Sequence, residues 1–188
     1  MSKRVDCEQA HKEHINRYKM AHNIGVAEYM RENAEKYHLS PDEMYVLGLL
    51  HDIGYLSGRV GHEKVGADIL NAIGLNQNYV YAIKYHGLNP KLIEEKPYDS
   101  FDFETAYKDL PELVLLYEAD MSIDARGYRV GFKARLDDIG QRYGYDSIAY
   151  KNASDTVDYV KRQLAALNCN SKEQHTFTVH KSVPIERE

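Results

Sequence analysis

One apolar helix restricts the folds open to this chain more than any other feature of the sequence. Ser40 can cap a helix, Pro41 suits the first helical position, and Glu43 completes a capping box. The residues that follow are apolar on most sides of this helix: Met44, Val46, Leu47 and Leu50. Such a helix has to be covered by other elements, so we expect it at the centre of a helical bundle. Gly54 marks its end.

Helical periodicity recurs along the rest of the chain. After a short charged helix over about residues 7–18, apolar residues recur at spacings of three and four from Met20 to Ala34. Further helices are expected over about residues 62–73, 76–86, 110–120, 128–143 and 154–167. The sequence therefore predicts an all-α fold. Its helical core covers residues 1–167 with an insertion at 90–109, and residues 168–188 are predicted to form an extended or disordered tail.

Composition limits the number of domains and the class of partner. The 188 residues, of which 43% are hydrophobic, suffice for one hydrophobic core, so we expect a single domain. A net charge of -5 and a pI near 6.0 argue against a protein that binds nucleic acid by neutralising phosphates. Two cysteines, Cys7 and Cys169, are too few for a disulfide framework. The sequence has neither a signal-peptide pattern nor an apolar run of membrane-spanning length, so we expect a cytoplasmic protein.

Six residues with metal-binding side chains lie at expected helix ends or on apolar helices. His51 and Asp52 directly follow the apolar helix, where the loosened last turn lets both side chains face one cavity. Asp120 lies on an apolar helix, where a carboxylate is costly unless it is paired or bound to a metal. In chain order the set is His22, His51, Asp52, His62, His86 and Asp120. Imidazole nitrogen and carboxylate oxygen suit zinc, iron, manganese or magnesium, although each remaining histidine alone could be a core or capping residue.

The ordered set resembles the HD superfamily of metal-dependent phosphohydrolases, whose signature is a His, then a His-Asp pair, then a distant Asp. His51 to Gly54 has the common HDIG form of the central motif. The stretch from His62 to Leu70 is similar to the His-xxx-Gly-Ala-xx-Leu helix of that superfamily. Residues 82–87 are similar to its Ala-Ile-x-x-His-Gly segment. The resemblance covers about residues 18–127 and implies an HD-domain helical bundle.

The resemblance also implies a role for each residue of the set. The implied primary metal site is the group His22, His51, Asp52 and Asp120. The implied second site is His62 and His86, with Asp52 as a carboxylate that bridges the two ions. We therefore expect two divalent ions, with iron, manganese or magnesium as candidates. Two ions can activate water and clamp phosphoryl oxygens without a protein nucleophile, so Asp52 is also predicted to be catalytic.

Arg126 is a further candidate site residue. Ala119-Asp120 with Arg126 six residues later resembles the Ala-Asp-x5-Arg segment of bacterial HD-domain hydrolases that split diadenosine tetraphosphate symmetrically. A guanidinium binds phosphate oxygens in a bidentate manner, so Arg126 is predicted to contact phosphate and to be catalytic. An ordinary surface salt bridge is the equal alternative. Arg59 and Lys84 are weaker candidates for the same role.

The chain departs from the superfamily pattern in three places. Tyr55 stands where many relatives have a lysine, and Lys19 stands where several have an arginine. The segment from Pro90 to Asp109 is longer than in the diadenosine tetraphosphate hydrolases. These departures affect the expected substrate more than the expected metal binding.

Three functions remain open at this stage. The leading hypothesis is a phosphohydrolase that uses metal-activated water on a nucleotide or another small phosphate ester, by cleavage of a phosphoric ester or a phosphoanhydride. A di-iron oxygenase of the HD type would instead consume O₂ and act on a substrate without phosphate. A silent nucleotide-binding or metal-binding module would lose ligand binding on substitution of His51 or Asp52 without any detectable activity. We expect a small phosphorylated substrate and no nucleic-acid or membrane partner, and a homodimer stays open.

Overall fold

Helices form nearly all of the regular structure in the computed structural model, which describes residues 19–57, 61–87 and 110–176, with side chains as far as residue 166. The first element is a helix over residues 19–33. The later elements are the 3₁₀ helix η1 (Ala34–Tyr37), α2 (Pro41–Leu50), the 3₁₀ helix η2 (Ile53–Ser57), α3 (His62–Ala72), α4 (Gln77–Tyr85), α6 (Pro111–Asp120), α7 (Phe132–Tyr143) and α8 (Ile148–Thr176). Outside helices, these residues form one isolated antiparallel bridge, between Ile123 and Arg129. The predicted all-α fold is confirmed.

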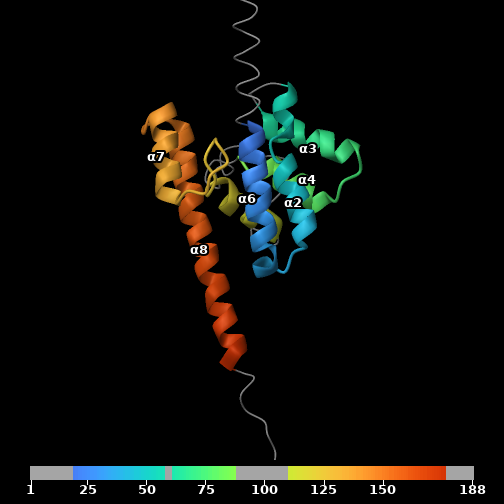
Figure 1. The fold of residues 1–188 in the computed structure, drawn as a ribbon, viewed down its shortest axis with the longest axis vertical. Coiled ribbons are helices and arrows are strands. Elements are labelled where there is room, and N and C mark those ends of the chain that lie inside the picture. The colour runs from blue at the N-terminus through green and yellow to red at the C-terminus, as the bar shows by residue number, and fades with distance from the viewer. Residues whose placement is uncertain (1–18, 58–60, 88–109, 177–188) are drawn as a thin grey trace, which may run out of the picture.

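The centre of the bundle is α6. Every residue from Glu112 to Ala119 is buried. This helix contacts α2, α4 and α8, and Figure 1 shows it within the bundle. The predicted central position of the helix that begins at Pro41 is wrong, because α2 turns one side to solvent and leaves Val46 47% exposed. The residue that ends α6, Asp120, is thereby carried into the interior of the protein.

The first described helix buries the later part of the face that its periodicity predicts, with Ala27, Met30 and Ala34 at 0% exposure, but not the earlier part. Met20 and Ile24 are 58% and 43% exposed. The buried face runs instead through His22, Val26 and Met30, which follow one another at a spacing of four residues. Because His22 lies on the buried face, its imidazole points toward Asp120 at the end of α6.

The helices α7 and α8 pack against each other after the chain leaves α6. The predicted last helix over residues 154–167 is longer than expected, since α8 begins at Ile148 and continues to Thr176, past the rest of the bundle in Figure 1. The prediction of an extended tail is therefore wrong for residues 168–176. Once a helix is nucleated by packing, each added residue gains a hydrogen bond without a new nucleation cost.

Several predicted segments lie outside the described residues. They are the leading helix over residues 7–18, the insertion at 90–109 and the tail beyond residue 176. Over the described residues, no helix combines the length and the apolar character that a membrane span requires.

Candidate metal centre

His51 and His86 are positioned by the same local geometry. Each directly follows the last residue of a helix, α2 or α4. In each case Nδ1 lies 2.7 Å from the carbonyl oxygen three residues earlier, of Gly48 and Ile83 respectively. A carbonyl oxygen can only accept a hydrogen bond, so Nδ1 carries the proton and donates it. When the ring is neutral, the lone pair of Nε2 then faces the interior.

His22 and His62 have the same orientation. Nδ1 of His22 donates to the backbone carbonyl of Asp124 over 3.1 Å, and Nδ1 of His62 lies 3.3 Å from Oε2 of Glu63. Nε2 of His22 then faces Oδ1 of Asp120 at 3.0 Å. Partners that fix Nδ1 and free Nε2 are typical of histidines that bind metal.

Gly54, the last residue of the HDIG motif, allows α3 to approach the His51-Asp52 corner. A Cβ atom at Gly54 would lie 1.8 Å from the carbonyl oxygen of His62 and 2.6 Å from the amide nitrogen of Gly66. No side chain fits into that space, so only glycine permits this approach. The glycine thus sets the distance between Asp52 and His62.

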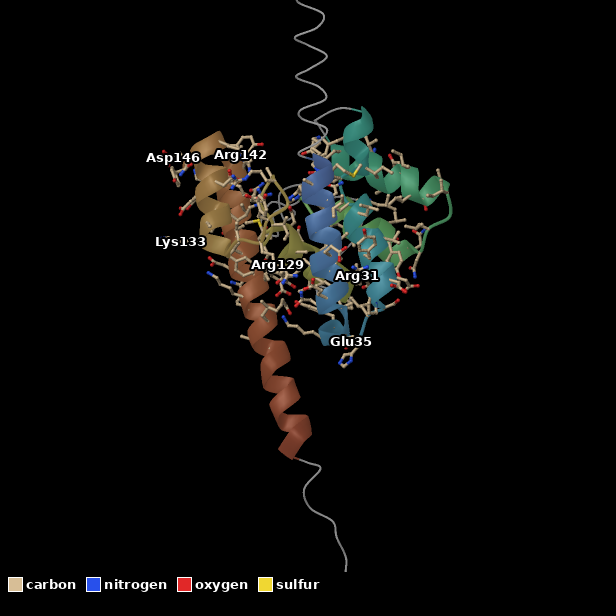
Figure 2. The ribbon with its side chains drawn as sticks, in the orientation of Figure 1. Arg31, Glu35, Arg129, Lys133, Arg142 and Asp146 are labelled. Carbon is tan, nitrogen blue, oxygen red and sulfur yellow. The ribbon has the colours of Figure 1, made fainter. Side chains whose placement is uncertain are left out.

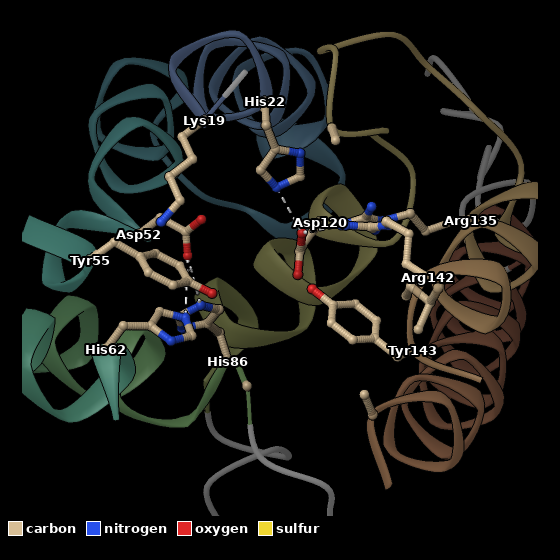
Figure 3. Close-up of a pocket in the computed structure, with 14 residues that line it drawn as sticks. Lys19, His22, Asp52, Tyr55, His62, His86, Asp120, Arg135, Arg142 and Tyr143 are labelled. Atoms are coloured by element: carbon tan, nitrogen blue, oxygen red, sulfur yellow. Dashed lines mark hydrogen bonds and ion pairs between the residues drawn. The ribbon is translucent and has the colours of Figure 1, made fainter. Parts of the chain in front are cut away.

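The Asp52 carboxylate is the point where these imidazoles meet. Its Oδ1 atom lies 3.6 Å from Nε2 of His51, 3.4 Å from Nε2 of His62 and 3.6 Å from Nε2 of His86. Figure 3 shows Asp52 facing His62 and His86, and His22 facing Asp120. Two groups of possible metal ligands share Asp52, and within each group the ligand atoms lie within 4.8 Å of one another: His22, His51 and Asp52; Asp52, His62 and His86.

The charges of the site require a cation. Burial by itself raises the pKa of Asp52, but His51, His62 and His86 outweigh burial and hold the pKa of this carboxyl well below its usual range. Burial likewise raises the pKa of Asp120, and the His22 imidazole and the Arg135 guanidinium reverse that effect. Both carboxylates are therefore ionised, and a proton or a metal ion has to lie between each of them and the Nε2 atoms that they face. A buried cluster of acceptors is unfavourable without a proton or metal ion between them, and this nitrogen and oxygen set suits divalent metals.

A cavity of about 440 Å³ opens beside the ligands. Its walls include Lys19 and Tyr55, the two residues that depart from the superfamily pattern. The Tyr55 ring stacks on the His62 ring with 3.9 Å between centroids, and Nζ of Lys19 lies 3.0 Å from the Tyr55 centroid. A cavity of this volume is large enough for a small organic ligand. The Lys19 ammonium gives this wall a positive charge.

The helix α7 supplies Ile139 and three polar residues to the cavity, none of which the sequence singled out. The polar residues are Arg135, Arg142 and Tyr143, and Figure 3 shows them on the side away from Asp52. The polar sequence of α7 is typical of a solvated surface helix. Its packing against α8 turns these side chains toward the metal ligands.

Arg126 does not reach this cavity. Its side chain is 66% exposed, and its guanidinium bonds Oδ2 of Asp124 through Nε at 3.1 Å and Nη2 at 3.0 Å. It lines a separate groove beside the helix over residues 19–33. The structure thus brings together the six predicted ligands and leaves Arg126 apart from them. Arg59 lies outside the described residues.

Comparison with known proteins identifies a family but no individual relative. No curated protein and no solved structure matches the chain. The HD domain matches residues 20–126, a segment that begins beside His22 and ends at Arg126. This segment contains all six side chains of the candidate centre and more than half of the sequence. The chain therefore belongs to the HD domain family.

Proposed function

We propose that this chain is a metal-dependent phosphohydrolase that acts on a nucleotide or another small phosphate ester. The observation that carries the proposal is the position of Asp52, whose Oδ1 atom faces three imidazole nitrogens within 3.6 Å. Members of the HD domain family are mostly metal-dependent hydrolases, which agrees with this arrangement.

The side chains of such a site would have different roles. His22, His51 and Asp120 would hold one ion, His62 and His86 a second, and Asp52 would bridge both. When bound, two divalent ions lower the pKa of a shared water, hold phosphoryl oxygens and stabilise the leaving oxygen. The backbone carbonyls behind His22, His51 and His86 keep each ring in the tautomer that can bind metal. Lys19 provides positive charge for a bound phosphate.

The cavity beside the ligands supports a nucleotide as the substrate class. It combines charged residues with the rings of Tyr55 and Tyr143, and aromatic faces are suited to stacking on a nucleobase. A nucleotide would use both features, because it joins an anionic phosphate to a planar ring. Diadenosine tetraphosphate is one candidate, although Arg126, on which that resemblance partly rested, lies outside the cavity.

The proposal is tested by a hydrolysis screen on the full chain purified without chelator. Nucleoside mono-, di- and triphosphates, dinucleoside polyphosphates and simple phosphate esters would each be supplied with iron, manganese or magnesium. We expect release of phosphate or nucleotide from one substrate class, and loss of this activity when a chelator removes the metal. Metal binding with no hydrolysis in any combination would contradict the proposal.

The same preparation separates the alternative functions. Anaerobic hydrolysis excludes an oxygenase as the source of the activity. Iron-dependent O₂ consumption with a substrate that lacks phosphate would replace the proposal by a di-iron oxygenase. Nucleotide binding that Asp52→Asn abolishes, without turnover under any condition, would replace it by a binding module.

A further inference from the structure

The wall of the cavity away from Asp52 carries a buried guanidinium with too few partners. The Arg135 side chain is only 11% exposed, and its Nε atom is buried without a hydrogen-bond partner. Its two contacts to carboxylates are long: Nη2 lies 3.5 Å from Oδ1 of Asp120, and Nη1 lies 3.2 Å from Oδ2 of Asp138. A buried guanidinium with an unsatisfied donor is costly, so it has capacity for a further anion.

A second arginine shares the same counter-ion. Nη2 of Arg142 lies 2.5 Å from Oδ2 of Asp138, the oxygen that Arg135 also contacts. The three residues lie on α7 at spacings of three and four, so their side chains share one face. A single carboxylate oxygen therefore serves two guanidinium groups. The trio keeps one net positive charge, and both arginines line the cavity of the metal centre.

Arg126 provides a contrast within the same protein. Its guanidinium and its backbone N–H all bond the single carboxylate of Asp124, which contacts no other guanidinium in the described part of the chain. That arginine is satisfied by its own loop and faces another groove. Arg135, in contrast, is incompletely satisfied, it shares Asp138 with Arg142, and both arginines line the cavity of the ligands.

We propose that α7 carries the phosphate-recognition residues of this site, Arg135 and Arg142, and that Asp138 is an internal anion that competes with a phosphoryl group for them. The inference rests on the proposed hydrolase function and extends it beyond the HD domain match, which ends at Arg126. A phosphoryl group offers three oxygens in place of the one that Asp138 supplies, and guanidinium groups bind such oxygens in pairs. Asp138 thereby lowers the affinity of the site for anions and keeps the two arginines together when no substrate is bound.

Substitution of Asp138 separates this role from a structural one. If Arg135, Asp138 and Arg142 only stabilise α7, Asp138→Asn would leave anion binding unchanged or weaken it. If Asp138 competes with phosphate, the same change tightens binding by roughly threefold to fivefold, the effect of one partly exposed charge pair. Arg142→Gln should weaken binding by about the same factor. Arg135→Gln should weaken it roughly 10- to 100-fold, because a buried charged hydrogen bond is lost.

Matched controls exist on the same helix. Lys133 is exposed on the outer side of α7 in Figure 2, and Lys133→Gln removes the same charge as Arg142→Gln. Asp137→Asn matches Asp138→Asn, since the Asp137 carboxylate forms no ion pair with either arginine in the described part of the chain. Neither control lines the cavity. Both should leave anion affinity unchanged.

The experiment is isothermal titration of inorganic phosphate and pyrophosphate into the full chain, both as purified and after treatment with chelator. Tighter binding by Asp138→Asn with weaker binding by Arg142→Gln, in a variant that keeps the wild-type melting temperature, supports the inference. Equal or weaker binding by Asp138→Asn overturns it. If the screen detects hydrolysis of a phosphate ester or anhydride but the variants do not change anion affinity in this way, only the proposed role of α7 is refuted. If the variants change anion affinity as expected but the protein binds no metal and hydrolyses nothing, the hydrolase function is refuted and the anion site on α7 remains.

Discussion

A buried carboxylate, Glu118, and a half-buried one, Asp120, lie two residues apart on α6, and their surroundings differ. Glu118 receives hydrogen bonds from the Tyr29 hydroxyl at 3.0 Å, the Tyr37 hydroxyl at 2.5 Å and the Lys36 ammonium at 3.3 Å. All three partners are donors, so the negative charge is fully satisfied within the fold. Glu118 does not line the cavity.

Asp120 has a different set of partners, in which an imidazole is nearer than the Arg135 guanidinium, whose Nη2 atom lies 3.5 Å from Oδ1. Its nearest neighbour is Nε2 of His22 at 3.0 Å, and the proton of that ring is used by Nδ1 in a bond to the carbonyl of Asp124. Oδ1 of Asp52 likewise faces the Nε2 atoms of three imidazoles, those of His51, His62 and His86. The comparison teaches that burial of a carboxylate does not by itself mark a functional site. A carboxylate whose partners are all donors stabilises the fold, whereas one that faces the Nε2 atoms of histidines is placed to bind a metal ion with them.

The largest effect is expected at the shared ligand. Asp52→Asn removes the bridging charge, so hydrolysis should fall about a thousandfold, equivalent to about 4 kcal/mol of transition-state stabilisation. Metal analysis should show loss of bound ions at the same time. The control is Asp68→Asn, which removes an exposed carboxylate from α3 and should change neither quantity. Wild-type metal content and rate in Asp52→Asn would contradict the assignment.

Substitution of Glu118 should lower the stability of the fold without changing metal binding. Glu118→Ala leaves two hydroxyls and an ammonium without their buried acceptor, so we expect the free energy of unfolding to fall by about 3 kcal/mol. Urea unfolding measures this, with Glu35→Ala at an exposed position as the control. Metal content per folded chain should not change. Loss of metal with unchanged stability would reverse the roles of the two carboxylates.

A smaller effect is expected behind His62. Glu63 contacts Nδ1 of this ring and helps to fix its tautomer. Partners of this kind change metal affinity by roughly 10- to 100-fold, and the 3.3 Å distance favours the lower end for Glu63→Gln. Competition with a chromophoric chelator would measure the affinity. The account requires that the ion held by His62 and His86 is the one affected, and an equal loss of both ions would count against it.

The smallest effect concerns the pH dependence of the Glu118 cluster. Burial and the Glu118 carboxylate raise the pKa of Tyr29 to about 12. A phenol whose pKa is higher in the folded than in the unfolded chain contributes stability below about pH 10, and this contribution disappears as the pH rises through about 12. Tyr29→Phe should therefore flatten the decline in unfolding free energy across that window. If the unfolding free energies of the wild type and Tyr29→Phe decline in parallel between about pH 10 and 12, Tyr29 does not cause the alkaline loss of stability.

The six candidate ligands could be found from the sequence because their signals are local. His51 and His86 each follow a helix and precede a glycine by three residues or fewer, and Asp120 stands out as a carboxylate on an apolar helix. These features survive in the fold because helix ends are set by neighbouring residues. The all-α fold was predictable for the same reason.

Features set by long-range packing could not be read in this way. Arg135 and Arg142 belong to a helix whose composition is that of a solvated surface, and only its contact with α8 turns them inward. Arg126 lies at the predicted spacing from Asp120, but the turn at Gly127, with φ of 84°, and the Asp124 carboxylate hold it outside the cavity. Spacing along a loop does not fix the direction of a side chain.

The most direct test of the account is the number of metal ions per chain in the wild-type protein and in His62→Ala. Metal analysis of both proteins, purified without chelator or nickel resin, would be combined with circular dichroism to confirm equal helix content. The account predicts about two equivalents in the wild type and about one in His62→Ala, because the remaining primary ligands still hold an ion. No bound metal in the wild type, or an unchanged number in the variant, would contradict the central claim that Asp52 joins two metal sites.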